Sequence, residues 1–236
     1  MSASDRSPKG FDAFASDYEA VLDAGLAVSG ESSGFFAKGR VQWLARCLTA
    51  EGASPRCVLD FGCGIGLSTR LLSGLSGVQK VIGVDPSARC LEQARQRSSD
   101  SRVRFVLADD FEPKGDVDLV FCNGVFHHIP PEARSQTVEL IRRALNIGGR
   151  LALWENNPWN PGTRYVMHCI PFDREAVMLS PHQARRLLVG AGLLVRRLDF
   201  VFFFPRWAAW LRRCEPWLHR IPLGAQYQVL AGLCGR

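Results

Sequence analysis

Short apolar segments alternate with helix-like segments through the middle of this 236-residue chain, and this alternation constrains the fold more than any other feature. Apolar runs predict five strands, at residues 57–61, 81–84, 103–107, 117–122 and 150–154. Helical segments between them are predicted at residues 66–75, 86–98 and 131–145. Such alternation is typical of a mostly parallel sheet covered by helices on both faces, so we predict an α/β fold.

The flanking segments extend this pattern toward both ends of the chain. Apolar residues at helical spacing predict two N-terminal helices, over residues 11–28 and 35–49, and Ser32 or Ser33 caps the second. After Glu155 the pattern loosens into a loop over 156–171 that is rich in Asn and Pro, with a helical turn as an option near Tyr165. Further helices are predicted at 181–191 and 206–219, and further strands at 193–204 and 226–233.

Charge, hydropathy and cysteine usage exclude several classes of protein. The net charge of +6 comes from scattered Lys and Arg, which favours anionic ligands but argues against nucleic acid. The polar segment 1–10 lacks the apolar core of a signal peptide, and the apolar run 200–204 is far too short to span a membrane. The eight cysteines form no CxxC pair, which predicts buried thiols in a reducing cytoplasm.

Acidic or polar residues follow four of the predicted strands, where ligands bind in sheets of this kind. The first strand ends in Asp60 and a turn with glycines at 62, 64 and 66, which brings bare backbone and a helix N-terminus close to a ligand. Asp85 follows the second strand and suits ribose hydroxyls. Asp109 and Asp110 follow the third strand, where Asp109 suits an adenine amino group, and Asn123 ends the fourth.

The glycine turn alone leaves alternatives open. It could be a tight strand–helix turn without a ligand, or it could bind a nicotinamide dinucleotide. The dinucleotide fingerprint is GxGxxG, whereas this turn is GxGxG. Asp60 would repel a pyrophosphate, but it suits an ammonium group.

Taken together, these motifs resemble those of class I S-adenosylmethionine-dependent methyltransferases. The match rests on residues 58–66, 83–85 and 105–109, extended by 118–120 and 145–151, in the same order and spacing. The resemblance implies a Rossmann-like, doubly wound sheet of seven strands with an antiparallel last strand. It also implies that residues 11–52 close over the cofactor, after a disordered leader at 1–10, and that 53–236 form the methyltransferase domain with substrate-side elements from about 156.

The resemblance also implies roles for individual residues. Asp60 and the glycine turn would hold the methionyl part of S-adenosylmethionine, Asp85 the ribose and Asp109 the adenine. The full set expected around this cofactor is Tyr18, Asp60, Gly62, Cys63, Gly64, Gly66, Asp85, Pro86, Asp109, Asp110 and Asn123. We expect the side chain of Cys63 to fill space while its backbone contacts the ligand.

Two adjacent histidines follow the fourth strand, where an acceptor would enter. Histidine can take a proton near neutral pH, so His127 is our preferred base for a hydroxyl acceptor and His128 the second candidate. We expect no metal, because no third ligand has a convincing spacing. The residues expected to contact the acceptor are Arg40, Phe126, Glu155, Asn156, Trp159 and Arg164, and Arg174 is a further cation that could pair with an acidic group.

The expected function is methyl transfer to a small-molecule acceptor, which can be acidic, with O-methylation in polysaccharide or secondary-metabolite biosynthesis as the favoured case. A nicotinamide-dependent oxidoreductase and a non-catalytic S-adenosylmethionine-binding module are the alternatives. The aromatic and basic segment 206–218 predicts a helix that packs on the sheet, covers a pocket or joins a homodimer, with a membrane-surface helix as another option. We expect a cytoplasmic protein with no stable membrane insertion.

Overall fold

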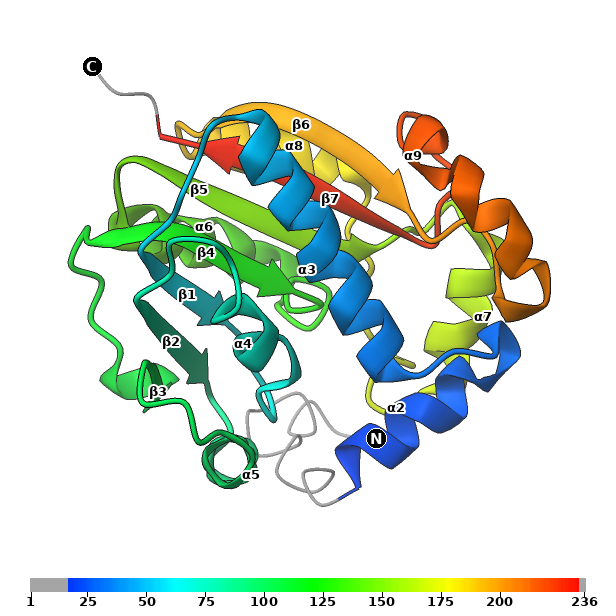
Figure 1. Cartoon of the computed structure of the whole chain (residues 1–236), viewed down its shortest axis with the longest axis horizontal. Helices are drawn as coiled ribbons and strands as arrows, with labels where there is room; N and C mark the ends of the chain where they lie inside the picture. Colours follow the sequence, from blue (N-terminus) through cyan, green and yellow to red (C-terminus); the bar gives the residue numbers. More distant parts are fainter. Residues whose placement is uncertain (1–16, 234–236) are drawn as a thin grey trace.

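The computed structural model describes residues 17–233, whose strands form one seven-stranded sheet in the order β3-β2-β1-β4-β5-β7-β6 (Figure 1). Strands β1 to β5 pair in parallel, and β7 runs antiparallel to both of its neighbours. The strands are β1 (Cys57–Phe61), β2 (Lys80–Asp85), β3 (Val103–Leu107), β4 (Val117–Asn123), β5 (Leu145–Asn156), β6 (Leu194–Val201) and β7 (Gln226–Gly232). The predicted seven-stranded α/β fold with an antiparallel last strand is confirmed.

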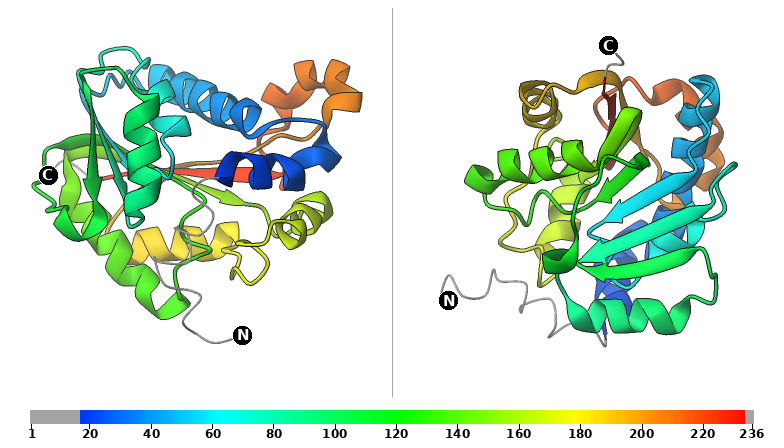
Figure 2. Two further views of the ribbon diagram at one scale, coloured as in Figure 1. Left: turned by 90° about the horizontal axis from the view of Figure 1, so that it is seen from below. Right: turned by 90° about the vertical axis from the view of Figure 1, so that its left-hand side faces the viewer.

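Helices cover both faces of the sheet (Figure 2). On one face, α3 (Ser33–Ala50) and α4 (Leu67–Leu72) bury Leu44 and Leu72 against the strands. On the other face, α6 (Arg134–Ala144) and α8 (Pro181–Gly190) bury Ile141 and Leu188. A further helix, α5 (Ala88–Arg97), packs against β2 and β3 through Leu91. The central strands are therefore apolar on both faces, as parallel strands between two helical layers require.

The remaining helices lie beyond the carboxyl ends of the parallel strands or between β6 and β7. They are α2 (Tyr18–Leu26), η2 (Ala27–Ser29), η3 (Ala108–Asp110), η4 (Pro131–Ala133), α7 (Pro161–Cys169), η5 (Arg206–Cys214) and α9 (Glu215–Leu218). Helices α2 and α7 contact each other beyond the ends of β1 and β4 (Figure 1). Helices α2 and α7 therefore cover the edge of the sheet at which the sequence predicts a bound ligand.

Several predicted boundaries differ from the structure. The 156–171 segment contains α7, because Asn160 caps it by accepting from the Thr163 N–H and Pro161 stands at its first turn. β5 begins earlier than predicted, at Leu145, and continues through the Gly148-Gly149 pair. β6 ends at Val201 instead of extending to residue 204, since Phe202 adopts a left-handed φ of 61°.

The N- and C-terminal predictions are only partly covered by the structure. The leader at 1–10, the residues 11–16 and Cys234 lie outside the described residues. Ser32 is the cap of α3, as one of the two predicted options, and accepts from the Phe35 N–H. Packing on the sheet was one of several options for 206–219, and its tryptophan rings do not pack there, because Trp207, Trp210 and Trp217 are 72–80% exposed. Among residues 17–233, no helix has both the length and the apolar character needed to cross a membrane.

Candidate active site

A cavity of about 140 Å³ lies beyond the carboxyl ends of β1 and β4, under α2 and α7. We call it the donor cavity. It brings together eleven of the residues that the sequence singles out: Tyr18, Arg40, Asp60, Gly62, Cys63, Gly64, Asn123, His127, His128, Glu155 and Asn156. They come from α2, α3, the turn after β1, the segment after β4 and the end of β5. Residues distant in the sequence therefore converge on one space.

The glycine turn needs its glycines for two reasons, backbone conformation and space. Gly62, Gly64 and Gly66 all have positive φ, from 52° to 78°, a region that other residues rarely adopt. A Cβ at Gly62 would clash with Val125, and one at Gly66 would press on Ala94 and Phe105. A Cβ at Gly64, which lines the donor cavity, would have no atom within 4 Å. The turn thus presents bare backbone to a ligand.

Cys63 lies between these glycines and serves packing. Its side chain is buried in a small cluster with Leu91, Ala94 and Phe105. Burial raises the pKa of its thiol well above the usual value, with Asp60 and Asp85 adding to the effect. The side chain therefore fills space as an uncharged group, as expected.

Two buried carboxylates flank the turn. Asp85 accepts from the N–H groups of Gly64 (2.8 Å) and Ser87 (2.9 Å), which ties the turn to the end of β2. Asp60 is 2% exposed and accepts from the Thr69 hydroxyl at 2.6 Å. Burial raises the pKa of Asp60 to about 7, against the opposing Thr69 hydrogen bond and with the charge of Asp85 adding to it. A cation placed beside Asp60 would relieve this cost.

Arg40 supplies the opposite charge. It is buried in α3, where Nη1 donates to Oε1 of Gln226 at 3.0 Å, while the buried Nε has no hydrogen-bond partner. Burial lowers the pKa of the guanidinium to about 10, and the charges of Tyr18 and Asp60 oppose the shift, so Arg40 stays protonated. A buried, incompletely satisfied cation and a buried carboxylate thus line the same cavity.

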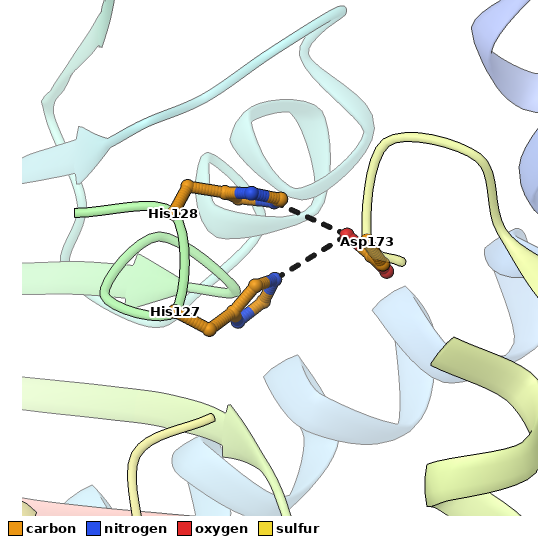
Figure 3. A group of neighbouring side chains, drawn as sticks. All are labelled: His127, His128 and Asp173. Atoms are coloured by element: carbon orange, nitrogen blue, oxygen red, sulfur yellow. Dashed lines mark ion pairs between the residues drawn. The ribbon is translucent and has the colours of Figure 1, made fainter. Parts of the chain in front are cut away.

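Behind the turn, the two histidines meet a carboxylate that the sequence did not single out (Figure 3). Nε2 of His128 lies 3.2 Å from Oδ1 of Asp173, and Nε2 of His127 lies 3.5 Å from the same atom. On its other side, Nδ1 of His127 lies 2.6 Å from Oε2 of Glu155. The second oxygen of Glu155 accepts from the Phe126 N–H at 2.8 Å. His127 is therefore held between two carboxylates.

This arrangement gives the two histidines different charges. Burial alone would lower the pKa of His127, but Glu155 and Asp173 outweigh it and raise the pKa to about 10. Burial lowers the pKa of His128, and the repulsion from His127 adds to this, so that ring is neutral at pH 7. The pKa of Asp173 falls to about 2, because hydrogen bonds from both histidines outweigh its burial. This disfavours His127, our preferred base, since it already carries a proton.

Other predicted residues lie away from the donor cavity. Phe126 was expected to contact the acceptor, and this is wrong, because its ring is completely buried in the core beneath α6. Trp159 and Arg164 were also expected there, but both are exposed and neither lines the cavity, and Arg174 is likewise exposed. Pro86, Asp109 and Asp110 are exposed and outside this lining, so their contacts with a cofactor stay predictions.

His127, His128 and Asp173 also form a group that could hold a metal ion. Within residues 17–233, their ligand atoms all lie within 4.8 Å of one another. The sequence argument against a metal, that no third ligand is recognisable, therefore fails. A different argument takes its place: both nitrogens of His127 face carboxylates, and the proton that this ring carries would have to leave before a metal could bind.

Comparison with known proteins identifies the fold and its family. A family model described as a methyltransferase domain matches residues 58–149. The trans-aconitate 2-methyltransferase of Azoarcus sp. (strain BH72) is 32% identical over 162 residues, which cover 68% of this chain and 58% of that protein. The protein of the same name from Rhodopseudomonas palustris (strain BisB5) is 32% identical over 120 residues, or 51% of this chain and 46% of that protein. The chain belongs to the class I S-adenosylmethionine-dependent methyltransferase family.

The matched segments span about half the length of these two curated relatives. Solved structures agree on the fold of this family member. A SAM-dependent methyltransferase from Archaeoglobus fulgidus superposes with a TM-score of 0.65 at 18% identity, covering 85% of this chain and 95% of that one. Geranyl diphosphate C-methyltransferase from Streptomyces coelicolor A3(2) gives a TM-score of 0.58 at 20% identity, covering 82% and 79%.

Three residues of this family member's site escaped the sequence analysis. Asp173 lies in a loop without periodicity, and only the Pro171-Phe-Asp173 order marks a turn there. Phe172 stacks on Tyr18, with ring centroids 5.1 Å apart, and closes the cavity under α2. Gln226 joins Arg40 to Asn156, since its Nε2 donates to Oδ1 of Asn156 at 3.0 Å. The sequence marks Gln226 only as the first residue of a predicted strand, and its pairing with Asn156 at the end of β5 is visible only in the structure.

Proposed function

We propose that this chain transfers the methyl group of S-adenosylmethionine to a small-molecule acceptor, with oxygen as the methylated atom. The observation that carries the proposal is the donor cavity, which combines bare glycine backbone with a buried carboxylate and a buried guanidinium. Family membership and the relatives named trans-aconitate 2-methyltransferase support methyl transfer to a small molecule. A polysaccharide or secondary-metabolite pathway remains part of the proposal.

The charges in the donor cavity suit the amino-acid end of the donor. That end carries an ammonium and a carboxylate. Asp60 would accept the ammonium, which would lower its raised pKa. Arg40, whose buried Nε lacks a hydrogen-bond partner, would pair with the carboxylate. This assignment gives Arg40 to the donor instead of the acceptor. Tyr18, stacked on Phe172, would cover the donor from α2.

When bound, S-adenosylmethionine supplies a methyl group on a positively charged sulfur, which is already an activated leaving group. The chain's own residues then have two tasks. They hold the acceptor in line with the methyl group, and alignment of this kind lowers the activation barrier by about 7–11 kcal/mol in favourable cases. They also accept a proton if the acceptor is a hydroxyl, which increases the rate by about 10²–10⁴-fold.

His128 is the better candidate for accepting that proton. It lines the donor cavity, 21% of its side chain is exposed, and its lowered pKa keeps the ring neutral at pH 7. Asp173 Oδ1 lies 3.2 Å from Nε2 of this ring and would pair with it once it is protonated, which would stabilise the charged form. His127, already protonated between Glu155 and Asp173, would position this carboxylate.

The first test is donor binding by isothermal titration calorimetry with S-adenosylhomocysteine. We expect saturable binding to the wild-type chain and a loss of at least tenfold in Asp60→Asn. Asp116→Asn, which removes an exposed carboxylate outside the donor cavity, is the matched control and should bind normally. Saturable NAD binding with no heat from S-adenosylhomocysteine would contradict the proposal and favour an oxidoreductase.

The second test is transfer of radiolabelled methyl to a panel of hydroxyl and carboxyl compounds that includes trans-aconitate. His128→Ala should slow turnover about 10²–10⁴-fold with a hydroxyl acceptor while donor affinity stays unchanged. A chain that binds the donor but transfers the label to no acceptor of the panel would support the non-catalytic binding module instead.

A further inference from the structure

A second cavity adjoins the donor cavity and is larger, about 310 Å³ against about 140 Å³. We call it the apolar chamber. Its wall is mainly aromatic and aliphatic, and includes Val28, Phe35, Phe36, Met167, Phe202 and Phe203. The two cavities share five lining residues: Leu26, Phe36, Asn156, Val166 and Gln226. The two cavities therefore lie side by side, and these five residues border both of them.

The aromatic wall of the chamber is held in a strained geometry. Among residues 17–233, Phe202 is the non-glycine residue with positive φ, at 61°. Its ring packs edge-on against Phe36, with centroids 4.9 Å apart and an interplanar angle of 78°. Gly39 makes room for the ring, since a Cβ there would lie 2.6 Å from Cε1 of Phe202. Strained backbone that persists beside a cavity is a recognised mark of function.

Two ionisable side chains at the chamber, Arg212 and Glu215, already form hydrogen bonds within the protein. Arg212 donates to Oε1 of Glu31 at 2.8 Å and to the Phe204 carbonyl at 3.0 Å, which leaves only its Nη2 without a partner. Glu215 accepts from the N–H groups of Phe203 and Phe204, at 3.0 and 3.1 Å. An ionic occupant would lose its hydration without gaining a full counter-charge, whereas an apolar occupant gains by burial.

We propose that the acceptor is an amphiphile whose reacting oxygen lies in the donor cavity near His128 and whose apolar body fills the chamber. The inference rests on the proposed function and narrows its acceptor class. The chamber, at about 310 Å³, is the roomier of the two cavities and is proposed to take a medium-length alkyl chain or a substituted ring.

A polyanion fits this pair of cavities poorly. The cationic side chains that line the donor cavity, within the part of the chain that the structure describes, are Arg40 and the protonated His127. The charge of His127 is balanced by Glu155 and Asp173, and Arg40 is assigned to the carboxylate of the donor, so neither cation is left for the acceptor. The acceptor named in the relatives, trans-aconitate, is a tricarboxylate, so this chain should differ from them in specificity.

The test is calorimetric binding to the full chain saturated with S-adenosylhomocysteine. The probes are two homologous series, 4-alkylphenols from ethyl to nonyl and straight-chain monocarboxylates from butanoate to decanoate. In at least one series we expect affinity to rise roughly fourfold per methylene, which converts ~0.8 kcal/mol per buried CH₂ at about 1.4 kcal/mol per tenfold. Trans-aconitate should bind more weakly than the longer members.

Substitutions at the chamber wall test whether the apolar part of the probe binds in the apolar chamber. Val28→Trp places a bulky ring at the chamber wall and should flatten the rise with chain length. Val189→Trp, on α8, is the matched control, because its exposure of 54% is close to the 57% of Val28, and it should keep the rise. Phe203→Ala enlarges the chamber and should move the best length to longer chains. Equal affinity of all three for S-adenosylhomocysteine verifies that they are folded.

The inference is overturned by any of three results: no dependence on chain length in either series, the same behaviour in both tryptophan variants, or binding of trans-aconitate in preference to both series. Failure of S-adenosylhomocysteine itself to bind would be a separate result, because it would contradict the proposed function before any acceptor is added.

Discussion

Donor binding should be linked to pH through Asp60. Its carboxyl is 2% exposed, and burial raises its pKa from 3.8 to about 7. A shift of about three pH units corresponds to roughly 4 kcal/mol of cost for the charged form in the free protein. The ammonium of the donor would favour that charged form. Binding should therefore release a proton wherever Asp60 is protonated beforehand.

The expected size of the effect follows from the folded pKa. Below pH 7 the affinity for S-adenosylhomocysteine should fall by about tenfold per pH unit, which gives roughly 30-fold between pH 8 and pH 5.5. Above pH 8 the affinity should level off as far as Asp60 is concerned. At pH 6 about 0.9 proton should be released per ligand bound, and at pH 8 about 0.1.

Calorimetry in two buffers of different ionisation enthalpy measures both quantities, since the difference in heat gives the number of protons released. Asp60→Asn is the control, and its weaker binding should lose the dependence on pH. An affinity in the wild type that changes less than threefold from pH 5.5 to 8 would refute the reasoning. If Asp60→Asn kept the full dependence of affinity on pH, this would also refute the reasoning. The titrating group would then be another residue of the donor cavity.

Three further outcomes follow from the same site. His127 has a folded pKa raised from 6.5 to about 10, so its contribution to stability is fully present below about pH 6.5 and is lost as the pH rises toward 10. Urea unfolding should show a decline on the order of 3–5 kcal/mol over that window, and His127→Gln should remove it. Arg40→Met should weaken S-adenosylhomocysteine binding about 10- to 100-fold with little change in the acceptor KM, whereas a raised KM alone would return Arg40 to the acceptor. Excess chelator should leave methyl transfer unchanged, and a rise in Tm with Zn²⁺ or Mn²⁺ would show that His127, His128 and Asp173 bind metal after all.

The donor side of the site could be predicted from the sequence because it is built from local signals. Asp60 and Asp85 lie at the carboxyl ends of β1 and β2, and parallel strands bring these ends to one edge of the sheet. The glycines were expected to allow a tight turn, and all three have positive φ. Short-range pattern and fold together predict where these groups lie in the chain, while their contacts with the donor stay predictions.

The rest of the site could not be predicted in the same way because tertiary contacts build it. Arg40 and Gln226 are 186 positions apart and meet only because α3 crosses the sheet above the start of β7. Phe126 was misassigned since adjacency to the histidines says nothing about which way its ring points. Helix α7, in contrast, was within reach, because Asn160 followed by Pro161 is a recognisable helix start.

The two adjacent histidines are the clearest case of chemistry that sequence cannot separate. His127 and His128 have the same side chain and are adjacent in the sequence, and only the folded chain gives them different surroundings. Glu155 reaches one ring and not the other, and Asp173 lies between them. Two negative charges hold the proton on His127, and that positive charge in turn helps to keep His128 neutral. Removing Glu155 should therefore do more than loosen His127: once His127 is less often protonated, the loss of its repulsion, a larger effect than the direct charge of Glu155, should raise the pKa of His128. The pH profile of methyl transfer to a hydroxyl acceptor should accordingly shift upward in Glu155→Gln, an outcome that a purely structural role of Glu155 would not produce.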